Sequence, residues 1–92
     1  MALRMEWSIE GPFSGAAGQT VRDVQEAVYW LDTSVMRIQE RANLTPFASD
    51  QLDQCARLLR ARMLDEADNA TSRRKQWSAT IGPLSMTLTP TG

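Results

Sequence analysis

The sequence predicts a mainly α protein, an antiparallel two-helix hairpin with a short β-strand-like arm at each terminus, in the order β-α-α-β. Three observations lead to this prediction. Apolar residues recur at intervals of three and four in the middle of the chain, they alternate with polar residues near both ends, and a threonine-proline pair follows a short link between the two helical stretches. A chain of 92 residues is expected to form one small domain, 1–92.

The N-terminal arm and loop are predicted over residues 1–19. Apolar residues at every second position indicate a half-buried strand: Leu3, Met5, Trp7 and Ile9. Gly11 and Pro12 are expected to end this strand. The small residues from Phe13 to Gln19 favour a flexible loop or linker.

The first helix is predicted over residues 20–43, with Thr20 and Asp23 as a start typical of a capping box and Asn43 as a left-handed cap at its end. Its apolar stripe is narrow and β-branched at most positions, as in a coiled-coil seam. This stripe consists of Val21, Val24, Val28, Leu31, Val35 and Ile38.

The second helix is predicted over residues 45–75, because Thr45 can cap it and Pro46 suits the first helical position. The short link implies that this helix runs antiparallel to the first. Its larger stripe residues are Leu52, Leu59 and Met63. We expect the two stripes to pack against each other as a helix seam.

The C-terminal arm is predicted over residues 77–92, where apolar side chains alternate with serine and threonine on either side of Gly82 and Pro83. These apolar residues are Trp77, Ile81, Leu84, Met86 and Leu88. The two arms could form a small sheet within one chain, or each could add to the sheet edge of a neighbouring subunit.

Composition argues against catalysis. The chain has no histidine and a single cysteine, Cys55, at helical spacing beside Leu58 and Leu59. A cysteine in that position is typical of an apolar core filler rather than a nucleophile. We therefore expect no enzyme activity, no catalytic residues, no metal site, no cofactor and no small-molecule substrate.

The expected partners are other protein subunits, either further copies of this chain or different proteins. Candidate contact residues are the aromatic and apolar side chains outside the seam: Tyr29, Trp30, Met36, Trp7, Trp77, Ile81, Leu84, Met86 and Leu88. Nucleic acid is a weaker hypothesis, because the net charge is −1 and the only basic run beside an aromatic residue is Arg73, Arg74 and Lys75.

Neither a membrane-spanning segment nor a secretory signal is predicted, so we expect a cytoplasmic protein where it is synthesised. The favoured function is a structural or assembly protein, with the hairpin and arms contacting neighbouring subunits. A small phage virion component, such as a connector, decoration or tail protein, fits that description by analogy of architecture. The alternative is a small inhibitor or regulatory adaptor, of the anti-defence or antitoxin-like kind, that binds one protein target.

Overall fold

The computed structural model describes residues 2–10 and 15–91. In chain order it contains β1 (Ala2–Ile9), β2 (Gly15–Val21), α1 (Val24–Arg41), α2 (Pro46–Arg62), a π-helical turn η1 (Met63–Ala67), α3 (Asp68–Ser72), β3 (Trp77–Ile81) and β4 (Leu84–Thr91). The predicted strand end at Gly11 and Pro12, together with Phe13, lies outside the described residues.

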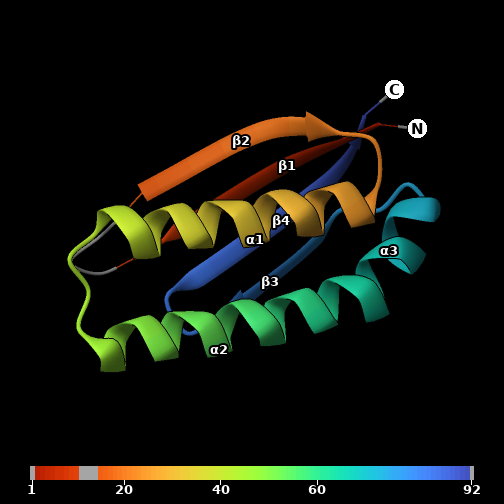
Figure 1. Ribbon diagram of the computed structural model, residues 1–92. Coiled ribbons are helices and arrows are strands. Elements are labelled where there is room, and N and C mark those ends of the chain that lie inside the picture. Colours follow the sequence, from red (N-terminus) through yellow and green to blue (C-terminus); the bar gives the residue numbers. More distant parts are fainter. Residues whose placement is uncertain (1, 11–14, 92) are drawn as a thin grey trace.

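The four strands form one antiparallel sheet in the order β2-β1-β4-β3. Figure 1 shows the helices lying across one face of this sheet, and the start of β1 lying beside the end of β4 at one end of it. The arms therefore pair within a single chain, with Ala2 opposite Thr91 and Ile9 opposite Leu84. Both edges of β1 and of β4 are occupied by neighbouring strands, which leaves β2 and β3 at the edges of the sheet.

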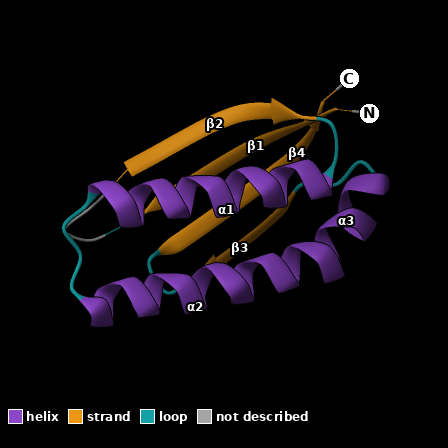
Figure 2. Cartoon of the chain, in the orientation of Figure 1, coloured by secondary structure: helices purple, strands orange, loops and turns teal. Residues whose placement is uncertain are grey.

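The prediction of a mainly α fold is wrong, because the sheet is a full layer rather than a pair of arms (Figure 2). The predicted element order is retained, but each terminal region supplies two strands instead of one. Residues 15–19 were expected in a loop and instead belong to β2, paired residue by residue with β1. Their glycines and alanines carry no alternation of apolar and polar side chains, so the pairing with β1, rather than local composition, determines their conformation.

Helix α1 begins four residues later than predicted, since Thr20 and Val21 belong to β2. Asp23 is the N-cap, and its side chain accepts a hydrogen bond from the backbone N–H of Glu26 at 2.8 Å. At the other end the C-cap is Ala42 in an extended conformation, so the prediction of a left-handed Asn43 is wrong. Among the described non-glycine residues, Arg74 alone has a positive φ.

Helix α2 begins as predicted, with Thr45 as N-cap and Pro46 in the first turn. The Thr45 hydroxyl accepts a hydrogen bond from the N–H of Ala48 at 3.1 Å. Buried positions then follow at steps of four residues, at Leu59, Met63, Ala67 and Thr71. A regular α-helix would rotate these side chains progressively off one face, because its period is 3.6 residues. The wider turn of η1 lies within this stretch and offsets that rotation.

One core lies between the helical layer and the sheet, and it includes most of the predicted helix seam. Val24, Leu31 and Val35 from α1 are buried there, as are Leu52 and Leu59 from α2 and Met63 from η1. Val28 and Ile38 are partly buried against this core, and Val21 enters it from β2. The stripes are thus covered by strand residues such as Met5 and Leu88 as well as by each other.

Candidate functional site

Strand β2 presents an unprotected edge. Its sequence, Gly-Ala-Ala-Gly-Gln-Thr-Val, contains neither a charged residue nor proline, and its register with β1 runs without a bulge from Gly15 to Val21. Gly15, Ala16, Ala17 and Gly18 are all exposed. Natural edge strands are usually blocked by lysine, proline or a bulge, because their unpaired backbone groups can bind another strand. The edge of β2 has none of these features.

The hydrogen bonding of β1 indicates which backbone groups of β2 face outward. The N–H of Glu10 donates to the carbonyl of Pro83 at 3.0 Å, so Glu10 faces the β4 side of the sheet. Backbone direction alternates along an antiparallel strand, so Ile9 and Trp7 face β2. Their partners are Gly15 and Ala17. The N–H and C=O groups of Ala16, Gly18 and Thr20 consequently point away from the sheet.

A groove lies between the first half of β2 and the last half of α1, with a volume of about 470 Å³. Its lining is mostly apolar and includes Trp7, Ala17 and Ile38, together with Ser34. Arg37 and Arg41, one helical turn apart on α1, lie at the same groove. The groove therefore lies beside the free edge of β2, on the helical side of the sheet, where it could hold side chains of an added strand.

The opposite edge strand, β3, is shorter than β2 and packs closely against the helices. Trp77 and Ala79, which face the helices, are buried in the core. The strand is five residues long and ends in a turn in which Gly82 has a φ of 58°. A Cβ atom at Gly82 would lie 2.9 Å from the Cys55 Sγ atom, so α2 packs closely against this turn. The two edges of the sheet are thus not equivalent.

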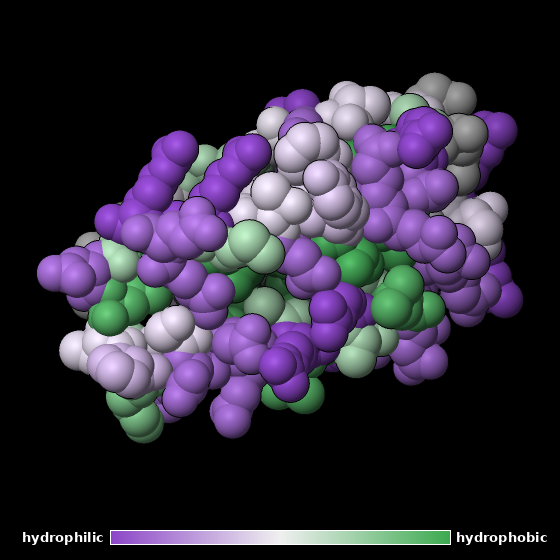
Figure 3. Space-filling model, viewed as in Figure 1, coloured by the Kyte–Doolittle hydropathy of each residue, from purple (hydrophilic) through white to green (hydrophobic). Residues whose placement is uncertain are grey.

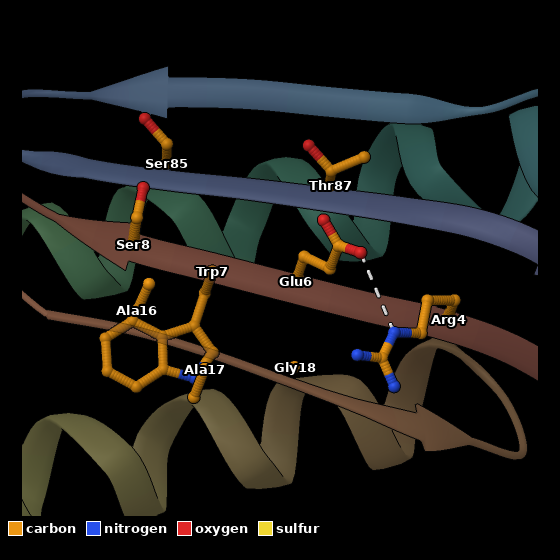
Figure 4. A pocket seen from close by; sticks show the side chains of 9 residues that line it. All are labelled: Arg4, Glu6, Trp7, Ser8, Ala16, Ala17, Gly18, Ser85 and Thr87. Atoms are coloured by element: carbon orange, nitrogen blue, oxygen red, sulfur yellow. Dashed lines mark ion pairs between the residues drawn. The ribbon is translucent and has the colours of Figure 1, made fainter.

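The face of the sheet away from the helices is polar. Figure 4 shows Arg4, Glu6 and Ser8 of β1 beside Ser85 and Thr87 of β4, with Arg4 and Glu6 in an ion pair at 3.7 Å. This surface holds a shallow depression of about 380 Å³. Both partners of the ion pair are substantially exposed, so the pair adds little to stability.

Four of the predicted partner-contact residues are core residues. Trp77, Leu84, Met86 and Leu88 are buried. They are buried because the arms pair within the chain and direct these side chains toward the helices. Trp7, Trp30 and Ile81 are partly buried against the same core.

Tyr29 and Met36 are the predicted contact residues that remain on the surface, 61% and 57% exposed. The rings of Tyr29 and Trp30 meet edge to face, with centroids 5.2 Å apart. Figure 3 shows the helical face as largely hydrophilic with separate hydrophobic patches. Single exposed apolar side chains of this kind need no partner to explain them.

The basic run beside an aromatic residue does not form a stacking site. Arg73, Arg74 and Lys75 are exposed, but the ring of Trp77 is buried and its indole N–H donates to the Glu66 carboxylate at 3.4 Å. That arrangement leaves no ring surface for a base next to the basic residues. Arg62 and Trp77, in that order, donate hydrogen bonds that lower the pKa of Glu66 below its usual value.

Within residues 2–10 and 15–91, no three histidine, cysteine or acidic side chains converge as metal ligands would. Cys55 is half-buried against the core, as a filler residue would be. No helix in the same residues has both the length and the apolar character needed to cross a membrane.

Sequence reasoning missed β2 and the groove. Arg37 and Arg41 carry no signal in the sequence itself, and only their position at the groove beside β2 makes them relevant. The absence of charge and proline over seven residues before a helix was the available signal for an open edge strand. Comparisons with protein-family models, with curated proteins and with solved structures found no match.

Proposed function

We propose that this protein is a non-catalytic protein-binding module that adds a strand of a partner protein to the free edge of β2. The observation that carries the proposal is the unprotected edge of β2, with the backbone groups of Ala16, Gly18 and Thr20 directed outward. Main-chain hydrogen bonds along such an edge provide affinity, and adjacent pockets for alternate side chains provide specificity.

Both arms pair within one chain. This pairing favours an adaptor or inhibitor that binds one target, rather than an assembly subunit whose arms are completed by neighbouring subunits. A strand-exchanging subunit would leave β1 or β4 with an open edge, whereas here both are central strands. An assembly role, including the virion setting, would have to use β2 in place of the arms.

The proposal is tested with peptides selected for binding. A library displays random peptides of about ten residues, each flanked on both sides by a carrier sequence so that it has no free terminus. Peptides that bind the purified protein are selected from this library. Their affinities are then measured by fluorescence polarisation. Ala16→Pro is the test variant, because proline removes an outward N–H and places its ring on the free edge. Ala16→Thr is the matched control, since it keeps the N–H and suits a strand.

We expect the selected peptides to bind the natural protein and Ala16→Thr equally well and to lose about tenfold or more in affinity for Ala16→Pro. Peptides that bind all three forms alike would contradict strand addition at β2.

A further inference from the structure

We infer that the segment bound by β2 belongs to a different protein and carries an apolar side chain for the groove together with an acidic side chain that faces Arg37 and Arg41. This inference rests on the proposed function and specifies its partner. A segment paired with β2 extends the sheet, so its alternate side chains point toward the helical side, where the groove lies.

The apolar part of the occupant follows from the lining of the groove. Trp7 is only partly buried although it lies opposite Ala17 in the middle of the sheet, because Ala17 is too small to cover it. Ile38 is partly buried on the facing side of α1. A branched or aromatic side chain from an added strand would cover both and bury apolar surface.

The acidic part follows from the charges. Arg37 and Arg41 are exposed, and in the described residues neither forms an ion pair, although five other arginines do. The groove lining contains no acidic side chain. Two arginines one helical turn apart can each donate to a carboxylate, and such charge-assisted hydrogen bonds select an acidic partner.

A second copy of this chain fits the groove poorly. Its own β2 would bring glycine, alanine, glutamine and threonine to the interface, with Val21 already buried in its own core. None of these side chains is acidic, and none of the free ones is a large apolar group. Pairing of β2 with β2 would thus leave the groove empty and the arginines without a carboxylate.

The test uses the peptides selected above and a charge reversal, Arg37→Glu with Arg41→Glu. The matched control is Arg73→Glu with Arg74→Glu, which changes the net charge by the same amount. These two residues follow α3, at the end of the molecule far from the groove (Figure 1). We expect peptides with alternating apolar residues and at least one acid. These peptides should lose about tenfold or more in affinity for the groove variant and little for the control. Replacing the acid by lysine should restore binding to the groove variant.

Three results would overturn the inference in distinguishable ways. If Ala16→Pro weakens peptide binding but the arginine variant binds the peptides normally, strand addition at β2 stands and the acidic partner is contradicted. If Ala16→Pro leaves the affinity for the peptides unchanged, strand addition at β2 itself is contradicted. A concentration-dependent doubling of the solution mass that Ala16→Pro abolishes would identify a second copy of this chain as the occupant. Circular dichroism of each variant verifies that the fold is intact.

Discussion

Neighbouring residues in this protein can have opposite roles, and Leu58 and Leu59 are the clearest pair. Leu59 is completely buried beneath the sheet, whereas Leu58 is 58% exposed on the outer side of α2. The sequence predicted this difference, because Leu59 lies on the apolar stripe and Leu58 does not. Trp77 and Met86 show the limit of such reasoning, since alternation in a strand separates two faces without saying which neighbour will cover each face.

The leucine pair gives a stability prediction. Leu59→Ala should lower the free energy of unfolding by about 2–5 kcal/mol, because it leaves a cavity in the core. Leu58→Ala serves as the control and should change that free energy by no more than about 0.5 kcal/mol. Urea denaturation followed by circular dichroism measures both. An equally large loss for Leu58→Ala would mean that a further copy of the chain covers this side of α2.

Among the elements, both helices and the strands β1, β3 and β4 were indicated by periodicity, while β2 was not. Helical and strand periods arise from side chains that face a core, so they are visible wherever one face is buried. Only Gln19 and Val21 of β2 are shielded from solvent, and its other residues are exposed on both faces. Because these residues are exposed, they show no periodic pattern that predicts a strand. The same exposure makes the edge of β2 the candidate site.

The outward direction of alternate residues in β2 can be tested without a partner. Ala16→Pro should change the free energy of unfolding by less than about 1 kcal/mol, because the N–H that it removes is not bonded to β1. Ala17→Pro removes an N–H that faces β1, leaves its carbonyl acceptor unpaired and should cost about 1–3 kcal/mol or more. Thermal unfolding compares the two variants. A larger loss for Ala16→Pro than for Ala17→Pro would reverse the assignment of the edge.

At the scale of the whole molecule, a helical layer covers one face of a four-stranded sheet, and most residues of the edge strand β2 are exposed. The helical stripes and the strand alternation were predictable from the chain alone. The strand order was not, because pairing of residues far apart in sequence places β1 between β2 and β4. The groove depends on that order and on the course of α1, so no local pattern could have indicated it.

Amide hydrogen exchange of the protein, alone and with a selected peptide, tests strand addition at β2 most directly. In the free protein the amides of Ala16, Gly18 and Thr20 should exchange faster than those of Ala17 and Gln19, which face β1. Adding the peptide should slow exchange at all three outward amides together. Unchanged exchange along β2, with new protection at β3 or around Tyr29 and Met36, would contradict the account and place the binding surface elsewhere.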